Sequence, residues 1–580
     1  MRRLAILVIL IATGPQIRAQ APATYRIAGK VVSSVDNHPL QRATVDILST
    51  PDRKVAQTVS SDEFGRFAFT GVPAGTFILR GNAPGYVATE YEQHDGFDTG
   101  IATGTGVDTE SLVLKVRAEG TITGTILDES AEPVDHAQVR LFRQTHAYGD
   151  SRIISAGIAN TNDLGRFEVL HLQPGTYFLA VSATPWYATH PDPAAASPAD
   201  YMVSTRGQQL SSAQMQAYNR GLQALQAMPT VSSSVDPTLD VAYPVTYYPG
   251  GTDSADATPI LIRGGNAVEL NMELKARAAI TLTIPHAAGE SAQPQNGRAQ
   301  VPPPPLLRTS VFGQLEFING QESRQTATGT VISGLAPGDY TLSDPRSPVN
   351  QSSAQSGTSP VLHLTERSST ATMPTAPDLA HLHVYVKAAG GATLPAQTRI
   401  GLARGVDTAV THFTEKDKTD ATFDAPPGDY YFSIAGGTRQ LYVRGILAGD
   451  QPLPSNDIHL APGATASFTV TVIPGTHTLK GVARKDGKPA AGAFILLIPT
   501  AELHDIRHPY RQQSDLDGSW DIANLAPGEY TLLAIGDGWD LDWLKPAVLS
   551  RYLPAAVTVE IPGTDSTVQT LTEPLTVQPK

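Results

Sequence analysis

The sharpest metal-site pattern in the sequence is His504-Asp505-Ile506-Arg507-His508, in which two histidines stand four residues apart. On a helix this spacing puts both imidazoles on one face, as in zinc peptidases, where a glutamate between them is the base. Here an aspartate takes that place, and Pro509 follows directly, which disfavours helical backbone in the residue before it. We therefore expect a polar loop between two strands rather than a catalytic zinc site.

Two other groups have the composition of cation ligands. His381 and His383 alternate in a predicted strand, so both face one side, where a third ligand would complete a metal site. Asp515, Asp517 and Gly518 resemble half of a calcium loop, but the closing glutamate and a third acidic position are missing. We expect surface histidines in the first case and a hairpin turn in the second. The sequence thus predicts no catalytic residue, no metal and no cofactor.

Several aromatic residues lie outside the regular strand pattern, and they are Trp186, Tyr187, Tyr243, Tyr247, Tyr248, Trp539 and Trp543. Trp186, Tyr187, Trp539 and Trp543 stand in loops rich in Pro, Gly and Asp, where exposed rings would stack on the apolar face of a sugar. Alternatively, these rings fill interfaces between neighbouring domains. Trp539 and Trp543 also have the spacing of one helical turn that packs both rings inward. Exposed coplanar rings would favour carbohydrate binding, and buried rings would favour the interface.

An internal repeat predicts the elements that must position these residues. The repeat contains two glycines ten residues apart, and an aromatic residue stands two positions after each glycine. It occurs in 65–77, 165–177 and 518–530. Upstream of each copy stand a glycine, a proline and an alanine in constant order: Gly29, Pro39 and Ala43; Gly124, Pro133 and Ala137; Gly481, Pro489 and Ala493. Weaker copies occur at 334–340 and 425–430. The upstream motif and the glycine-aromatic motif occur in the same order in each copy, which indicates repeated domains.

The repeat has the pattern of short strands. Residues 43–48 and 67–69 alternate between apolar and polar, which is typical of strands with one buried face. Pro174-Gly175 and Pro527-Gly528 predict type II turns between antiparallel strands, because proline fixes φ at the first corner and glycine accepts a positive φ at the second. The aromatic residue after each of these glycines begins the next strand. We expect its ring to lie in the core.

The order Gly-x-[Val/Ile], Pro-x-x-x-Ala, Gly-x-[Phe/Trp] and Pro-Gly-x-[Tyr/Phe] resembles the regulatory-like domain of zinc carboxypeptidases, a β-sandwich akin to transthyretin and to starch-binding-like folds. The resemblance covers 24–117, 119–183 and 477–535, and more weakly 305–345 and 378–447. It implies an all-β protein of tandem antiparallel β-sandwich domains with a carbohydrate-binding-like fold. Carboxypeptidases hold zinc in an α/β domain, and no alternating βαβ pattern is present in this sequence. The resemblance therefore implies a fold and not an activity.

The first residues have the order of a secretory signal. Arg2 and Arg3 precede the apolar run 4–12, and Ala19 provides a small residue for cleavage. We expect residues 1–19 to be a signal peptide, and no second long apolar run follows. The sequence therefore predicts a mature chain without a transmembrane segment that is secreted, periplasmic or associated with the cell surface.

Composition limits the possible domain organisation, chemistry and partners. The chain has 580 residues, which is too long for one core, and its 50 glycines and 45 prolines favour short strands and many turns. It contains no cysteine, which excludes disulfides, cysteine-bound zinc and a cysteine nucleophile. A net charge of -13 argues against nucleic acid as a partner, because such binding needs Lys and Arg to neutralise phosphates.

We expect five sandwiches, at 24–117, 119–275, 276–376, 377–472 and 473–580, of which the third and fourth are degenerate. Residues 200–228 carry apolar side chains at helical spacing, which predicts a helical insertion in the second domain. The predicted function is that of a non-catalytic exported scaffold or adhesion protein, and the alternative is a carbohydrate-binding protein that uses the loop aromatics. The expected partner is a polysaccharide or a cell-envelope protein, and the oligomeric state stays open.

Overall fold

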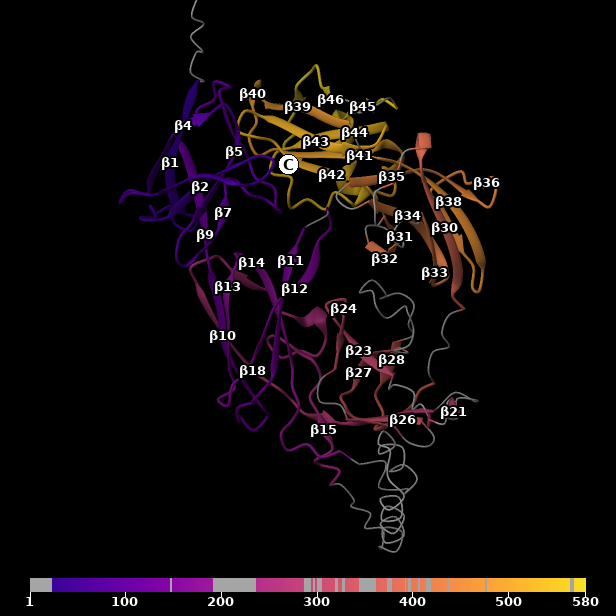
Figure 1. Ribbon diagram of the computed structural model, residues 1–580. Helices are drawn as coiled ribbons and strands as arrows, with labels where there is room; N and C mark the ends of the chain where they lie inside the picture. The colour runs from indigo at the N-terminus through magenta and orange to yellow at the C-terminus, as the bar shows by residue number, and fades with distance from the viewer. Residues whose placement is uncertain are drawn as a thin grey trace, which may run out of the picture.

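The computed structural model describes residues 23–146, 149–190, 236–285, 294–295, 298–299, 305–318, 322–325, 329–343, 361–372, 378–391, 393–394, 398–404, 407–413, 419–436, 439–474, 477–563 and 568–580. The predicted signal peptide (1–19) and helical insertion (200–228) lie outside these residues. Within them the regular elements are almost all strands, which confirms the predicted all-β fold class (Figure 1). Of the helices in the described ranges, not one has the length and hydrophobicity needed to cross a bilayer.

The first unit is a sandwich of two sheets, ordered β4-β1-β9-β6 and β3-β2-β5-β7, with β8 also paired to β5. Its strands are β1 (Thr24–Ser33), β2 (Thr44–Ser49), β3 (Val55–Ser60), β4 (Arg66–Pro73), β5 (Gly75–Asn82), β6 (Tyr86–Val87), β7 (Thr89–Glu90), β8 (Ile101–Thr103) and β9 (Leu112–Ala118). The alternating apolar side chains of both sheets meet in one core, which includes Ile27, Val45, Phe67 and Phe69.

The second unit repeats this plan in the sheets β13-β10-β18 and β12-β11-β14-β16, with β17 paired to β14. Its elements are β10 (Gly120–Leu127), β11 (Gln138–Thr145), β12 (Arg152–Asn160), β13 (Arg166–Leu172), β14 (Gly175–Ser182), β15 (Val241–Ala242), β16 (Thr246–Tyr247), η2 (Ser254–Asp256), β17 (Ile260–Ile262) and β18 (Ala267–Glu273). Strand β15 pairs instead with β19 (Arg277–Ala278), which leads into the third unit.

The third unit has the sheets β25-β26-β20-β29 and β24-β23-β27-β28, and a separate pair β21-β22. Its strands are β20 (Ile280–Pro285), β21 (Pro294–Gln295), β22 (Arg298–Ala299), β23 (Leu306–Val311), β24 (Gln314–Phe317), β25 (Glu322–Gln325), β26 (Gly329–Leu335), β27 (Gly338–Ser343), β28 (Val361–Leu364) and β29 (Ser368–Thr370).

In the fourth unit one long strand, β35, pairs with both layers, so the strands form a continuous sheet ordered β32-β31-β34-β35-β38-β30-β33. Its elements are β30 (Ala380–Ala388), η4 (Ala389–Gly391), β31 (Thr398–Arg404), β32 (Asp407–Phe413), β33 (Asp420–Ala425), β34 (Gly428–Gly436), β35 (Arg439–Ala448), β36 (Gln451–Pro452), β37 (Asp457–Leu460) and β38 (Thr465–Pro474).

The fifth unit has the sheets β40-β39-β43, joined by β46 and β47, and β42-β41-β44-β45. Its elements are β39 (His477–Lys485), β40 (Lys488–Pro489), β41 (Phe494–Pro499), η5 (Thr500–Glu502), β42 (Tyr510–Gln513), β43 (Ser519–Leu525), β44 (Gly528–Ile535), α3 (Pro546–Leu549), η6 (Leu553–Ala555), β45 (Val557–Ile561), β46 (Val568–Thr570) and β47 (Leu575–Thr576).

One feature of the pairing is common to all five units and was not predicted. The first strand of each unit pairs in parallel with a strand near its end, in the pairs β1-β9, β10-β18, β20-β29, β30-β38 and β39-β46. Most other pairs are antiparallel. The third and fourth units therefore share the topology of the strong repeats although their sequence phrases are weak.

The first glycine of the repeat is required by close packing. Gly65, Gly165 and Gly518 have φ between 68° and 78°, a left-handed conformation that favours glycine. A Cβ on any of them would lie 2.4 to 2.6 Å from a backbone carbonyl oxygen of the unit's first strand. This packing explains why a glycine precedes the buried aromatic in each strong copy.

The Pro-Gly step differs from its prediction. The strand before it belongs to one sheet and the strand after it to the other sheet, as in β4 to β5, β13 to β14 and β43 to β44. Gly528 has a φ of 153°, and the φ of Gly175 lies outside the range from 20° to 160°, whereas the second corner of a type II turn has a φ of about 80°. The predicted type II turn is therefore wrong. The chain crosses between layers at this step, and the strands before and after it both direct apolar side chains into the core between the layers.

The aromatic residue after this crossover is buried in the core, as expected. In four units it is a tyrosine whose hydroxyl donates a hydrogen bond to the carbonyl four residues earlier, just before the Pro-Gly pair: Tyr177 to Gln173 (2.7 Å), Tyr340 to Ala336 (2.6 Å), Tyr430 to Pro426 (3.0 Å) and Tyr530 to Ala526 (2.8 Å). The first unit has Phe77 instead. There the Thr103 hydroxyl donates to the equivalent carbonyl, that of Pro73, at 2.7 Å.

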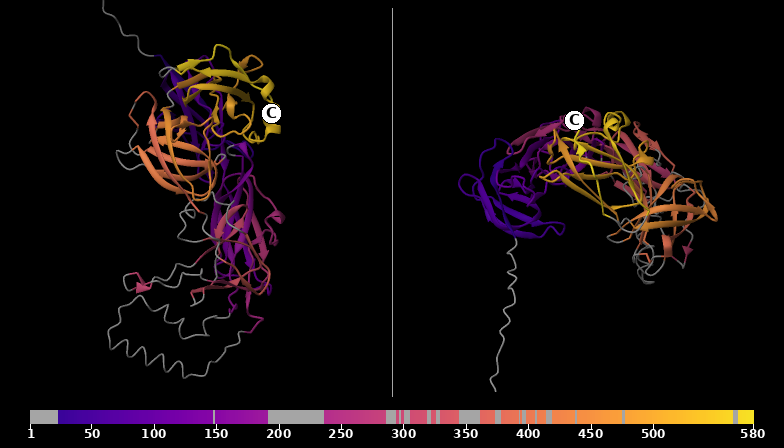
Figure 2. Two further views of the ribbon diagram at one scale, coloured as in Figure 1. Left: turned by 90° about the vertical axis from the view of Figure 1, so that its right-hand side faces the viewer. Right: turned by 90° about the horizontal axis from the view of Figure 1, so that it is seen from above.

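The fifth unit lies beside the first unit and the fourth unit, although these three are far apart in the sequence (Figures 1 and 2). The second and third units extend away from this group, toward the bottom of Figure 1. Direct contacts join the fifth unit to the first, second and fourth units. The five sandwiches are thus packed together and are not separate beads on a string.

We expect Tyr530→Phe to lower the free energy of unfolding of the fifth unit by about 1 to 2 kcal/mol, because the Ala526 carbonyl loses its donor while the ring stays in place. Native-state hydrogen exchange of the β44 amides in the full chain measures this. Tyr385→Phe is the matched control, because its ring is 42% exposed, and it should leave exchange unchanged. Equal protection in both variants would contradict the role given to the hydroxyl.

Candidate functional site

Trp543 lies where the fifth unit meets the second. Its side chain is only 1% exposed. Gly149 of the second unit has φ 77°, and a Cβ there would lie 2.2 Å from Trp543 Cε2, so only glycine leaves room for the ring. Next to it the Leu544 amide donates to the Gly149 carbonyl at 2.9 Å. The ring therefore fills an interface between units.

Trp539 lies where the fifth unit meets the first. The ring is 9% exposed and packs edge to face on Phe494, with 4.7 Å between centroids. From the first unit, Phe97 lies 5.1 Å away and His94 stacks on the indole at 5.9 Å. The helical turn predicted across 539–543 is absent, since this segment forms turns and helix α3 begins only at Pro546. Neither buried tryptophan is accessible to a sugar in this arrangement.

Trp186 and Tyr187 have a different environment. The Trp186 side chain is 77% exposed and meets Tyr187 edge to face at 5.8 Å between ring centroids. The Tyr187 hydroxyl donates to the Glu129 carboxylate, and burial together with Glu129 raises the pKa of Tyr187 to about 12. The four predicted loop aromatics therefore lie in three separate places and do not form a coplanar row.

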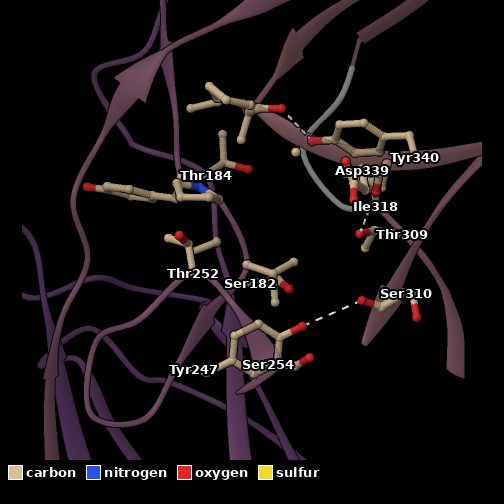
Figure 3. A pocket seen from close by; sticks show the side chains of 18 of the residues that line it. Ser182, Thr184, Tyr247, Thr252, Ser254, Thr309, Ser310, Ile318, Asp339 and Tyr340 are labelled. Atoms are coloured by element: carbon tan, nitrogen blue, oxygen red, sulfur yellow. Dashed lines mark hydrogen bonds between the residues drawn. The ribbon is translucent and has the colours of Figure 1, made fainter. Parts of the chain in front are cut away.

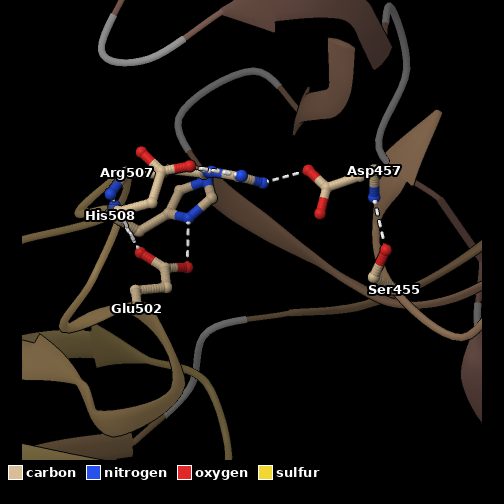
Figure 4. A network of polar contacts seen from close by, with 6 residues as sticks. Ser455, Asp457, Glu502, Arg507 and His508 are labelled. Atoms are coloured by element: carbon tan, nitrogen blue, oxygen red, sulfur yellow. Dashed lines mark hydrogen bonds and ion pairs between the residues drawn. The ribbon is translucent and has the colours of Figure 1, made fainter. Parts of the chain in front are cut away.

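The segment with the two spaced histidines forms a loop at the contact between the fourth and fifth units (Figure 4). The Glu502 carboxylate accepts hydrogen bonds from the Arg507 and His508 amides and pairs with His508 Nδ1 at 2.7 Å. Burial raises the pKa of Glu502, but the His508 and amide contacts outweigh it, so the net pKa is lowered. His504 is exposed and does not join this group.

Arg507, between the two histidines, makes the contact with the fourth unit. Its guanidinium pairs with Asp457, which begins β37, and lies over the Tyr431 ring with 5.1 Å to the centroid. Nearby, the Tyr442 hydroxyl donates to the Asn524 carbonyl at 2.6 Å. The loop that resembles a zinc motif thus serves the packing of two sandwiches.

The other histidine pair lies on the surface. His381 and His383 project from β30 on one face and pair with Asp424 at 2.5 Å and Asp420 at 3.2 Å on β33. All four side chains are substantially exposed. Across the residues that the structure describes, no cluster of three or more His, Cys, Asp or Glu side chains is arranged to hold a metal ion.

The two aspartates of the predicted hairpin turn, Asp515 and Asp517, make different contacts. Asp517 accepts hydrogen bonds from the amide and hydroxyl of Ser519, which closes the turn before β43. Asp515 reaches the first unit, where its carboxylate accepts from the Gly100 amide at 3.0 Å, while the Leu516 amide donates back to the Gly100 carbonyl at 2.9 Å. Burial, with Asp517, Asp521 and Asp98 nearby, raises the pKa of Asp515 to about 7 despite the bond from Gly100.

Two more polar residues complete the contact between the first and fifth units. The Gln513 side chain, 2% exposed, donates to the Glu92 carbonyl and to the Thr99 hydroxyl, both at 2.7 Å. Arg511 pairs with Asp95 at 2.5 Å. Sequence reasoning missed these residues, because their partners lie more than 400 positions away and no local pattern marks them.

A cleft of about 500 Å³ lies between the second and third units (Figure 3). From the second unit it is lined by Ser182 and Thr184, at and after the end of β14, and by Thr252 and Ser254, in the loop before β17. Strands β23 and β27 of the third unit supply the opposite wall, which includes Thr309, Ser310, Asp339 and Tyr340. Of its lining residues, Tyr243 and Tyr247 stand out in the sequence as aromatics outside the strand pattern, and no local motif marks the others.

Both walls of the cleft are held by aromatic and polar contacts. Phe312 of the third unit packs on three rings of the second unit, Phe142, Phe178 and Tyr247, with centroids 5.0, 5.3 and 5.1 Å away. Gln314 Nε2 donates to the Ile153 carbonyl at 3.0 Å. Arg140, on the second unit, pairs with Glu316 at 2.9 Å. The cleft is therefore bounded by two fixed surfaces.

We expect Trp543→Ala to destabilise the full chain by about 3 to 5 kcal/mol, since it leaves a cavity where the ring packs against Gly149. Trp186→Ala is the matched control and should change stability by less than about 0.5 kcal/mol, because that ring is exposed. Urea unfolding followed by circular dichroism measures both. Similar losses in the two variants would refute the interface role of Trp543.

The contact made by Asp515 should weaken as pH rises. The folded-state pKa is about 7 and the ordinary value is 3.8, so the folded chain binds more protons between pH 4 and 7. The contribution of this group to stability therefore falls across that window. Asp515→Asn keeps an oxygen acceptor for Gly100 and removes the titration. We expect it to reduce the loss in thermal midpoint between pH 5 and pH 8, and an unchanged loss would contradict this assignment.

Comparison with known proteins gives one match to a family. Residues 26–109 match the model of the carboxypeptidase regulatory-like domain. A search of curated proteins found no match.

Solved structures with partial similarity include two pilins. The Bacillus anthracis TIE protein is 11% identical, with 80% of this chain and 76% of that chain covered and a TM-score of 0.16. Shaft pilin SpaA from Lactobacillus rhamnosus GG is 12% identical over 29% of this chain and 90% of its own, with a TM-score of 0.16. The minor pilin GBS52 from Streptococcus agalactiae is 11% identical over 43% and 95%, with a TM-score of 0.18. Similarity at this level carries no information on function.

In contrast, the family match agrees with the sandwich formed by β1 to β9, and the chain carries a carboxypeptidase regulatory-like domain in residues 26–109.

Proposed function

We propose that the chain is a non-catalytic scaffold or adhesion protein that acts outside the cytoplasmic membrane. The observation that supports this most is the location of its chemically distinctive side chains at the contacts between units. Trp539, Trp543, His508 and Asp515 resemble parts of binding or catalytic sites, yet each lies at or beside a contact between sandwiches. These residues fix the positions of the units.

The arrangement of contacts suits a load-bearing or presenting role. The fifth unit contacts the first through Gln513 and Asp515, the second through Trp543, and the fourth through Arg507 and Tyr442. Segments from distant parts of the chain are thereby held together without disulfides, since the sequence contains no cysteine. An assembly of this kind presents its loops and faces in constant relative positions.

Carbohydrate binding is the second candidate function, and the exposure of Trp186 favours it. An indole that is 77% exposed beside Tyr187 offers a flat apolar surface to a sugar ring. Under this proposal the partner is a polysaccharide of the cell envelope. Under the scaffold proposal the partner is an envelope protein.

Retention on envelope material tests the proposed function. The chain without its first 19 residues should co-sediment saturably with purified cell walls or envelope membranes of its source organism. Trp543→Ala, which loosens the packing of the units, should reduce retention. Val35→Ala, at a 52% exposed position of the first unit, is the control and should leave retention unchanged. Absence of retention on every envelope fraction would contradict the proposal.

The two candidate functions predict different results in the same assay. If the partner is a protein, protease treatment of the envelope should abolish retention and Trp186→Ala should not affect it. If the partner is a polysaccharide, retention should survive protease and fall in Trp186→Ala.

A further inference from the structure

The cleft between the second and third units has the lining of a ligand site rather than that of a packing gap. Pockets for small ligands form preferentially at domain interfaces and hold a few convergent polar groups beside apolar surface. This cleft has about 500 Å³, which is within the usual range for such sites. We propose that it binds a neutral oligosaccharide.

Hydroxyl groups supply the polar part of the lining. The side-chain hydroxyls of Ser182, Thr184, Thr252 and Ser254 line the cleft, and none has a hydrogen-bond partner within the described part of the chain (Figure 3). Each hydroxyl both donates and accepts, as a sugar hydroxyl does. A row of such groups along one wall matches a ligand with many hydroxyls.

Carboxylates add strong acceptors. Asp253 and Asp339 also line the cleft, one on each wall. Asp339 pairs with His363 at 2.6 Å, and the Asp253 carboxylate accepts from the Ala255 amide at 2.9 Å. A carboxylate has further lone pairs for ligand hydroxyls.

The charge of the lining selects against acidic ligands. Arg140 is the cationic side chain in the lining, and its guanidinium is paired with Glu316 at 2.9 Å. A second guanidinium, that of Arg308, lies over the lining residue Phe317, but Asp253 and Asp339 balance it. The cleft therefore has no surplus positive charge to attract a phosphate, sulfate or uronate. A neutral glycan fits this balance better than an anionic one.

An exposed ring provides apolar surface beside the hydroxyls. Phe317 lines the cleft from the third unit and is 56% exposed, with the Arg308 guanidinium 4.8 Å from its centroid. The C–H face of a pyranose is apolar and stacks on such rings, while its hydroxyls reach the polar wall. The two walls are held in place by Phe312, so little ordering is needed on binding.

The inference deepens the carbohydrate-binding candidate and does not depend on the scaffold proposal. The full chain without its first 19 residues is applied to an array of neutral and acidic oligosaccharides. The neutral oligosaccharide with the strongest signal is then titrated by calorimetry. Thr252→Tyr places a bulky side chain at an exposed position of the cleft, and Phe317→Ala removes the exposed ring. We expect each variant to weaken binding about tenfold or more.

Phe64→Ala is the matched control for Phe317→Ala. Phe64 is 53% exposed on the first unit, and its ring also lies beneath a guanidinium, that of Arg66 at 5.2 Å. We expect this variant to bind as the unchanged chain does. Circular dichroism of all variants checks that they fold.

Three results would overturn the proposal: retention of no neutral glycan, a preference for acidic glycans or peptides, or unchanged affinity in both cleft variants. Binding that depends on Trp186 alone would also overturn it, because the loop would then act without the cleft. None of these outcomes affects retention on protein components of the envelope, so failure here is distinguishable from failure of the scaffold proposal.

Discussion

In each unit the chain passes from one layer to the other just before the buried aromatic. The carbonyl at this step needs a hydrogen-bond donor from outside the strand pairing. Tyrosine hydroxyls supply it in four units, and Thr103 supplies it to Pro73 in the first. A buried carbonyl without a donor is costly, so the side chain that fills the core also satisfies the backbone. This bond ties the crossover to the core.

Much of this architecture could be predicted from local sequence. The alternation in 43–48, the glycine at Gly65 and the aromatic at Tyr177 all report the environment of single strands, and the fold class followed from their repetition. The type II turn was wrong because a Pro-Gly pair does not reveal whether the next strand joins the same sheet. The parallel pairing of β1 with β9 was missed for a similar reason, since pairing partners lie some 80 residues apart.

For the site residues, local sequence was even less informative, because their environment depends on residues far away in the chain. The sequence could place Trp186 and Trp543 in loops, but not decide that one is exposed and the other buried, because burial of Trp543 depends on Gly149 almost 400 positions away. The cleft is assembled from several short segments of two units, among them those near 182, 243, 252, 309 and 339. Serine and threonine in loops are too common to indicate a site until the fold brings them together.

Packing around the fifth unit sets the arrangement of the other units. It joins sandwiches that are remote in sequence through polar contacts such as Gln513 with Thr99 and aromatic contacts such as Trp539 with Phe97. These contacts set the orientation of neighbouring units, and the cleft between the second and third units lies within the same fixed assembly. A scaffold and a ligand site are therefore compatible properties of one structure.

The central claim is that the sandwiches keep one relative arrangement, and a distance measurement between the first and fourth units tests it most directly. The chain has no cysteine, so spin labels attach only to cysteines introduced at the exposed positions Val55 and Asp450. Both units are held by the fifth, and double electron–electron resonance should give one narrow distance distribution. A broad distribution would show that the units move independently and would contradict the account.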